Sequence, residues 1–379
     1  NDKIGSEKYY YLQTYPMLTS NRPSFGIDNN PENRIYEGKE GNVDVTWERA
    51  RKLNVGIDMR FFNSKLAVTI DAFTEKRVNI LDYDRSISTI YGMLGATDGT
   101  KGFPPQNLGE VRNSGFEFDA SFNDKIGKVA YYIKGNVSFA RNKVLKKGEE
   151  PQTYSWTSGI GRKVNQRFGM IVDGFYNTQE EIDALPSSFS SNLKLGDLKY
   201  RDVNGDGMIN SYDVAPIGKT RLPEIMYGLT LGGNWKGIDW QLFFQGAAIT
   251  DLYVNGYGYW EFTNTGSVMK HHLGRWTPEN KEHATYPSLS PTTSKQNHRL
   301  STFWLKNGNY LRLKNVQIGY TLPSVWTKKA KITSARIYVS GTNLFTFVGF
   351  KEYDPESNDG GNTSYPQMRN YSVGLNLKF

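Results

Sequence analysis

Apolar and polar residues alternate with a period of two along much of this chain. Between residues 53 and 61, for example, Leu53, Val55 and Ile57 alternate with small or polar residues. Such alternation is typical of strands with one apolar and one polar face. It predicts strands at 53–61, 66–73, 116–122, 129–139, 225–235, 238–244, 311–320 and 371–379. Between Leu311 and Tyr320 the phase slips by one residue, which predicts a β-bulge.

The connections between these strands alternate in length. With a weaker start at Tyr9–Gln13, the chain holds about ten strands, several of them long enough to cross a bilayer at a tilt. The short connections are Asn63–Lys65, Asn123–Gly127, Lys236–Gly237 and roughly Pro323–Lys331, and the long ones are 19–44, 81–107, 146–221, 251–298 and 348–366. Outer-membrane β-barrels have this asymmetry, and their closure leaves no unpaired backbone in lipid. The sequence therefore predicts an all-β, antiparallel transmembrane β-barrel with long extracellular loops; a soluble β-sandwich or solenoid is the alternative.

The composition fits strands and excludes several other classes. The 379 residues include 24 Tyr, 20 Phe, 8 Trp and 38 Gly, a mixture that suits pleated, half-buried strands. The absence of Cys excludes disulfides, thiolate metal sites and Cys nucleophiles. No apolar run predicts a membrane-spanning helix, and the N-terminus lacks the apolar segment of a signal peptide. The net charge of +8 is not gathered into a basic stripe, so no nucleic acid partner is expected.

The segment from Asp202 to Asp213 has the ligand spacing of a calcium-binding loop. The residues at loop positions 1, 3, 5, 7, 9 and 12 are Asp202, Asn204, Asp206, Met208, Asn210 and Asp213, with the Met contributing its carbonyl. Gly207 at position 6 permits the sharp turn that such a loop needs. Asp213 replaces the bidentate Glu of the strongest loops. We expect a structural Ca²⁺ that pins a long loop; an Asx-rich turn without metal is the alternative.

Other polar clusters have simpler interpretations. His271, His272, His283 and His298 lie in or beside one long connection and could bind a metal, but adjacent His side chains diverge. Solvated loop histidines are the alternative. Glu117 and Asp119 lie on one strand face, where they could form an acid–base pair or line the lumen of a barrel. No nucleophile elbow, phosphate loop or zinc-protease helix is present, so no enzyme is expected and no catalytic residue is assigned.

Several aromatic residues fall in the long connections. They could stack on sugar rings or grip a partner, and packing within the loop is the default expectation. They are Trp156, Tyr257, Trp260 and Trp276.

Motifs spread from about Trp47 to the end of the chain resemble the SusC/RagA-like TonB-dependent transporters of Bacteroidetes-type bacteria. Taken jointly and in this order they are specific to that family. They are Gly109–Glu117, Gly196–Asp202 leading into the 202–213 loop, Pro223–Gly228, Phe243–Gly246, Arg275–Asn280, Tyr310–Val316 and Gly341–Phe345.

The resemblance implies a larger protein in the outer membrane. The 379 residues would be the last ten or so strands of a 22-stranded barrel whose N-terminal plug is absent from this chain. The extracellular loops would include 146–221 and 251–298. The whole protein would import a glycan or peptide, energised through TonB and working with a SusD-like surface lipoprotein. The alternatives are a surface β-rich binding protein or adhesin without transport, and a small complete barrel that acts as a porin or enzyme.

Overall fold

The computed structural model describes most of the chain and divides it into two compact units. The described residues are 10–15, 17–18, 24–27, 30–35, 40–86, 104–291, 294–329, 331–357, 359, 365 and 367–379. Unit 1 spans Asn1–Leu53, Phe73–Ser114 and Arg141–Val164, and unit 2 spans Asn54–Ala72, Gly115–Ala140 and Asn165–Phe379. All the sites discussed below lie within unit 2.

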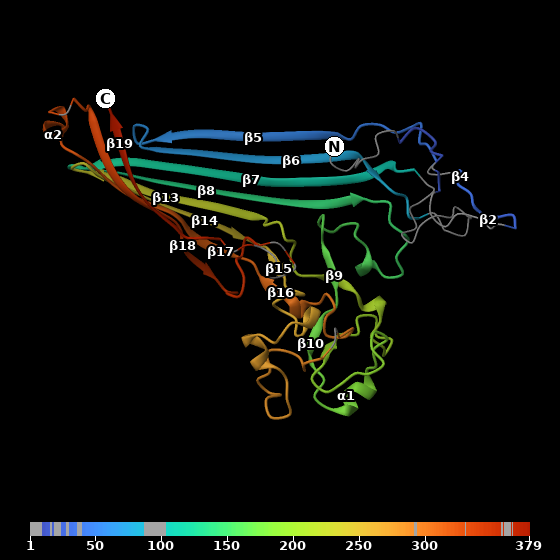
Figure 1. The fold of residues 1–379 in the computed structure, drawn as a ribbon. Coiled ribbons are helices and arrows are strands. Elements are labelled where there is room, and N and C mark those ends of the chain that lie inside the picture. The colour runs from blue at the N-terminus through green and yellow to red at the C-terminus, as the bar shows by residue number, and fades with distance from the viewer. Residues whose placement is uncertain are drawn as a thin grey trace. The chain divides into compact units, whose positions relative to one another are not determined.

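Nine long strands of the described residues form one sheet (Figure 1). Their spatial order is β19-β18-β17-β14-β13-β8-β7-β6-β5, so neighbours in the sheet are also successive long strands along the chain. The pairings from β8 to β19 are antiparallel. With β5 and β19 at its edges, the sheet is not closed into a barrel. The strands are β5 (Arg49–Phe61), β6 (Leu66–Asp82), β7 (Gln106–Ile126), β8 (Val129–Lys146), β13 (Ile225–Trp235), β14 (Ile238–Ala248), β17 (Tyr310–Thr321), β18 (Ser334–Val348) and β19 (Asn370–Lys378).

Shorter elements occupy the connections. None of the helices in the described residues is long and apolar enough to span a membrane. The two α-helices are α1 (Gln179–Ala184) and α2 (Ser324–Lys328), and short 3-10 turns cover Ser155–Thr157, Ser211–Asp213, Thr263–Thr265, Lys270–Gly274 and Thr302–Trp304. The short strand pairs are β1 (Met17–Leu18) with β4 (Arg34–Ile35), β2 (Ser24–Phe25) with β3 (Asn30–Pro31), β9 (Arg167–Gly169) with β12 (Ala215–Ile217), β10 (Val172–Phe175) with β11 (Leu198–Tyr200), and β15 (Asp251–Tyr253) with β16 (Leu305–Asn307).

The two faces of the sheet differ in chemistry. One cross-strand row joins Tyr131, Gly233, Trp240, Ile318, Val339 and Val373, and the row beside it joins Tyr132, Gly232, Gln241, Gln317, Ser340 and Ser372. Successive side chains on a strand point to opposite faces, so the first row belongs to an apolar face and the second to a polar face. The apolar face is open: Val373 is 80% exposed and Ile57 is 57% exposed.

The connections alternate in length as the sequence predicted. Residues 62–65, 127–128, 236–237 and 322–333 join strands at one end of the sheet, and the long connections leave from the other end. Lys236 and Gly237 have φ values of 49° and 88°, the left-handed conformation that a two-residue hairpin turn requires. The predicted β-bulge is also confirmed, because the register of β17 shifts at Lys314 against both of its neighbours.

Two details of the sequence prediction need correction. Residues 10–13 of the weak tenth strand form a turn and irregular chain, so the sheet has nine strands in the described residues instead of about ten. Strand β7 begins at Gln106, ten residues before the predicted start at Phe116. Residues 87–103, which form most of the predicted 81–107 connection, lie outside the described residues, as do parts of 19–44 and 348–366.

Unit 1 is held in part by charged pairs between strand segments. Glu110 accepts from Lys76 at 2.7 Å and from Lys146 at 2.9 Å, which links β6, β7 and β8. Arg77 pairs with Glu75 at 2.5 Å on its own strand. These pairs are half-exposed, and we expect each to contribute little to stability.

Candidate functional site

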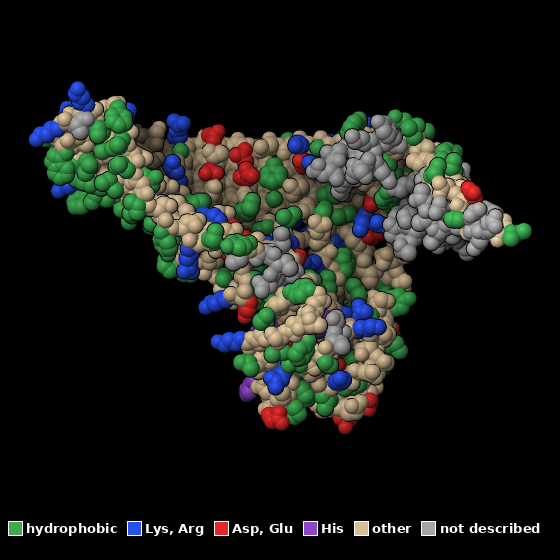
Figure 2. All heavy atoms as spheres, viewed as in Figure 1, with side chains coloured by type: hydrophobic (Ala, Val, Ile, Leu, Met, Phe, Trp, Pro, Cys, Tyr) green, Lys and Arg blue, Asp and Glu red, His purple; other side chains and the backbone are tan. Residues whose placement is uncertain are grey.

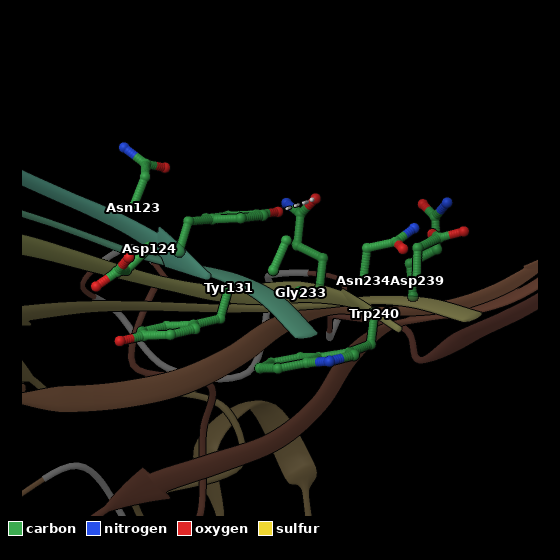
Figure 3. A pocket seen from close by; sticks show the side chains of 11 residues that line it. Asn123, Asp124, Tyr131, Gly233, Asn234, Asp239 and Trp240 are labelled. Atoms are coloured by element: carbon green, nitrogen blue, oxygen red, sulfur yellow. Dashed lines mark hydrogen bonds between the residues drawn. The ribbon is translucent and has the colours of Figure 1, made fainter. Parts of the chain in front are cut away.

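A cavity lined by residues of both faces of the sheet lies beside a pair of glycines, Gly232 and Gly233. A ring packs over each of them: Tyr132 over Gly232, and Trp240 over Gly233 with its Nε1 3.0 Å from where a Cβ would stand. Figure 3 shows Asn123, Asn234 and Asp239 on one side of the strands, with Tyr131 and Trp240 on the other. The cavity volume is about 360 Å³, at the lower end of the range for ligand pockets. A side chain at either glycine would clash with the ring beside it.

A second cavity, on the polar face, contains the predicted carboxylate pair. Glu117 and Asp119 line about 360 Å³ together with Asn136, Ser138 and Gln245. The residues that line it include no His, Lys or Arg. The structure places the pair on the polar face, where the sequence expected it.

The long connections of unit 2 fold together into a body that we call the loop cluster, residues 165–224, 249–309 and 349–357. The strand pairs β9–β12, β10–β11 and β15–β16 lie within it. Figure 1 shows it beyond the ends of β13, β14, β17 and β18. Its buried hydrophobic core consists of Met170, Leu198, Tyr200, Ile209, Leu252, Val254, Tyr259, Tyr286, Trp304 and Phe350.

Two buried side-chain amides, of Gln296 and Asn297, join segment 249–309 of the loop cluster to segment 165–224. Asn297 accepts from Leu198 N at 2.8 Å and donates to Asp197 Oδ1 at 2.8 Å. Gln296 donates to Leu198 O at 2.8 Å and accepts from Ser187 Oγ at 2.9 Å. Both amides are at most 1% exposed, and hydrogen bonds that satisfy buried polar groups are costly to lose. The connections therefore form a packed body.

The loop aromatics that the sequence singled out mostly pack within the loops. Trp276 is buried over Gly196, whose φ of 83° and close contact with the ring exclude a side chain, and its Nε1 donates to Asn177 Oδ1 at 2.8 Å. Trp260 stacks on His298, with ring centroids 4.6 Å apart. In unit 1, Trp156 stacks on Tyr154 at 4.5 Å. Tyr257 remains 49% exposed.

The expectation of solvated loop histidines is wrong for two of the four. His272 is 2% exposed and His298 is 8% exposed. Each accepts a backbone N–H at Nδ1, from Met269 and from Ser294 respectively. Each then has Nε2 free to donate, His272 to Tyr259 O and His298 to Glu261 Oε2. Both ring nitrogens of His272 and of His298 form hydrogen bonds within the protein, which leaves none for a metal ion.

Glu261 is the buried charge at the centre of this network. It is 2% exposed and accepts from Tyr286 Oη at 2.7 Å, Ser290 N at 3.0 Å and His298 Nε2 at 3.1 Å. Burial alone would raise the pKa of the Glu261 carboxyl, but these donors outweigh it and lower the pKa to about 2. Burial and the nearby His271 lower the pKa of His272 below 6.5. The network thus favours ionised Glu261 and neutral His272.

We predict that acid loosens the loop cluster in two steps. Since the pKa of folded His272 is depressed, the unfolded protein takes up this proton first, and stability falls as the pH drops below about 6.5. The folded pKa of Glu261 is also depressed, so its contribution is fully present above pH 4.5 and is lost towards pH 2, about 3 kcal/mol in all. Hydrogen exchange of residues 259–304, corrected for the intrinsic rate, would measure both steps.

Two variants distinguish the contribution of Glu261 from that of His272. Glu261→Gln should remove the lower step and leave the upper one. His283→Gln, at an exposed position, should change neither step. An unaltered acid profile in Glu261→Gln would contradict the assignment.

A buried arginine on the polar face holds the connection that follows β18. The Arg312 side chain is 1% exposed and donates to Asp354 Oδ2 at 2.7 Å, Glu356 Oε2 at 2.5 Å and Thr346 Oγ1 at 3.0 Å. Tyr310 donates to the other oxygen of Glu356 at 2.9 Å. Sequence reasoning missed this group. The available signals were Arg312 at a polar-face position of its strand and the later Asp354-Pro355-Glu356. Nothing in the sequence shows that these residues contact each other.

The predicted calcium loop is a tight turn in which the acidic side chains accept backbone N–H groups. Asp202 accepts from Gly205 N at 2.7 Å and Gly207 N at 2.8 Å. Asp213 is fully buried and accepts from Val203 N and Asn210 N, both at 2.8 Å. No group of three or more acidic or His side chains close enough to hold a metal ion occurs in the part of the chain that the structure describes. Calcium binding at this loop stays a prediction.

The fold and these sites together define a class of protein. An antiparallel meander with an open apolar face, a polar opposite face and short turns at only one end is the wall of an outer-membrane β-barrel. Hydrocarbon would cover the apolar face. The polar face and loop cluster carry the groups that can meet a solute or a partner.

Comparison with known proteins identifies the family. The family model described as "TonB dependent receptor-like, beta-barrel" matches residues 13–344, and the chain belongs to this outer-membrane family. It is 26% identical over 374 residues to TonB-dependent receptor P26 of Formosa agariphila, covering 90% of this chain and 36% of the relative. To TonB-dependent receptor SusC of Bacteroides thetaiotaomicron it is 25% identical over 353 residues, covering 90% and 33%.

A solved structure shows the same fold. The RagAB peptide importer in its "open-open" state aligns with all of this chain and 39% of its own, with a TM-score of 0.74 and 23% identity. The chain therefore spans between a third and two fifths of the length of these relatives.

Proposed function

We propose that this chain is the C-terminal part of the barrel of an outer-membrane nutrient importer. The observation that carries the proposal is the sheet itself, with an open apolar face, a polar face and a folded loop cluster at the end away from the short turns. The similarity to the RagAB peptide importer supports uptake of a peptide, and a glycan is the other substrate class that the motif resemblance implies. Enzymatic activity is not part of the proposal.

The proposed transport mechanism rests on the resemblance to SusC/RagA-like TonB-dependent transporters. A wide lumen would leak, so an N-terminal plug would close it and TonB would move that plug with energy from the inner membrane. The connections 146–221 and 251–298 would be extracellular, and a SusD-like surface lipoprotein would cover them. The part of these connections within the loop cluster suits that role, because a packed body presents a fixed surface to a partner.

Gel mobility and uptake test the proposal. The full-length protein, extracted with detergent, should migrate faster unboiled than boiled, with a boiled mass about twice 43.0 kDa or more. Cells lacking it should lose growth on one class of oligosaccharide or peptide, and loss of TonB should have the same effect. A species that needs no detergent would support the adhesin alternative, and a heat-modifiable chain near 43.0 kDa would support the small barrel.

We also propose that the 202–213 loop binds a structural Ca²⁺. The ligand spacing supports this, as does a backbone already folded tightly around Asp202. The ion would require the amides of Asn204 and Asn210, which now donate to Asp206 Oδ2 at 2.8 and 3.1 Å, to turn their oxygens inward.

Terbium luminescence of the full-length protein should detect the calcium site. We predict Tb³⁺ emission that Ca²⁺ displaces, and at least a tenfold loss of affinity in Asp206→Ala. Asp173→Ala, which removes an exposed carboxylate elsewhere in the loop cluster, is the matched control and should bind normally. Equal emission from both variants would leave the loop as an Asx-rich turn.

A further inference from the structure

The four short turns share one charge sign. Residues 62–65, 127–128, 236–237 and 322–333 contain six lysines and no Asp, Glu or Arg. We call these lysines the lysine rim: Lys65, Lys128, Lys236, Lys328, Lys329 and Lys331. By contrast, the long connections 147–224 and 249–309 together hold equal numbers of basic and acidic residues. The positive charge is therefore concentrated at the short-turn end.

The lysine rim is exposed and almost unpaired. All six side chains are exposed. Lys65 pairs with Asp124 at 2.7 Å, and none of the other five is in an ion pair within the described residues. Lys236 Nζ lies 5.1 Å from the centre of the Trp235 ring. Mutual repulsion of such charges is unfavourable, so the rim is suited to an anionic surface.

Exposed apolar side chains lie beside the lysines. Phe62 is 70% exposed and Ile126 is 69% exposed at the first two turns. Val325 and Trp326, in α2, are 70% and 64% exposed. Figure 2 shows basic and hydrophobic side chains next to each other over the region of α2. Aromatic rings with neighbouring lysines are typical of the boundary between hydrocarbon and headgroups.

We propose that the lysine rim binds the anionic phospholipid headgroups of the membrane leaflet at the short-turn end. The lysines would contact lipid phosphates while the exposed Phe62, Ile126 and Trp326 enter the acyl boundary. A soluble polyanion would match the charge but would leave these apolar side chains in water. The inference rests on the proposed barrel function, since it requires the sheet to span a membrane.

Lipid competition on the full-length protein in neutral detergent tests this. Fluorescent phosphatidylglycerol is the probe, and unlabelled phosphatidylglycerol, phosphatidylcholine and glycerol phosphate compete. We expect phosphatidylglycerol to compete at least tenfold better than phosphatidylcholine, and glycerol phosphate not to compete. The triple variant K328Q/K329Q/K331Q should weaken binding at least tenfold, because each lysine near an anionic surface contributes roughly a fivefold factor.

Two further variants make the result specific. K328R/K329R/K331R keeps the charge and should bind as the unmodified protein does. K270Q/K281Q/K295Q removes three exposed lysines of the loop cluster and should also leave binding unchanged. Equal loss in this control, or competition by glycerol phosphate, would overturn the inference. A protein that is heat-modifiable but shows no lipid preference fails only this inference, whereas one that is not heat-modifiable fails the proposed function.

Discussion

Replacing Trp304 by Ala is expected to destabilise the loop cluster by about 3–5 kcal/mol, the usual cost of removing a fully buried Trp. The Trp304 side chain is 0% exposed. Its ring meets Tyr286 at 5.6 Å and Tyr259 at 5.8 Å, both edge-on, and its Nε1 donates to Asn297 O at 2.7 Å. The variant leaves a cavity and an unpaired buried carbonyl. The cluster should open locally while the sheet stays folded.

Hydrogen exchange of segments 165–224 and 249–309 in the full-length protein measures this opening. Trp326→Ala is the matched control, because that side chain is 64% exposed in α2, and it should leave loop protection unchanged. Trp304→Phe should recover part of the loss, since a ring is kept without its N–H. Protection in Trp304→Ala equal to that of the control would mean that the cluster is not a cooperative unit.

The strands of the sheet could be predicted because each residue of a barrel wall has one of two environments. Leu53, Val55 and Ile57 face one of them and the intervening residues face the other, so the pattern stands in the sequence itself. Where both faces of a strand carry polar side chains, the alternation is lost and the strand is not predicted. Residues 106–115 of β7 show this, since the charged residues Glu110 and Arg112 stand at positions in phase with the apolar Phe116 and Phe118.

The loop cluster could not be predicted because its contacts are distant in sequence and follow no period. Asn297 reaches Leu198 and Asp197 across about a hundred residues. The sequence predicts a solvated loop residue at His298, because nothing in it shows that Glu261 and Trp260 contact this side chain. Polar residues in such a body are buried through specific pairing, which a single sequence does not reveal.

Replacing Arg312 by Ala is expected to release the connection after β18, at a cost of about 3–5 kcal/mol. The guanidinium is 1% exposed and bridges Asp354 and Glu356, so its loss leaves two mostly buried carboxylates without their partner. Removing one partner of a buried ion pair costs far more than the pair contributes. We expect residues 349–357 to exchange freely and to become open to proteases, while unboiled gel mobility stays that of a folded barrel.

Lys314→Ala provides the control for this prediction. Lys314 lies 3.5 Å from the same Glu356 carboxylate, but its side chain is 31% exposed, and its removal should cost less than about 1 kcal/mol. Arg312→Lys keeps the charge without the planar fork, so it should restore only part of the protection. Equal protection of residues 349–357 in Arg312→Ala and Lys314→Ala would contradict the prediction. Other contacts, such as the hydrogen bonds from Tyr310 to Glu356 and from Arg221 to Ser357 O, would then hold the connection.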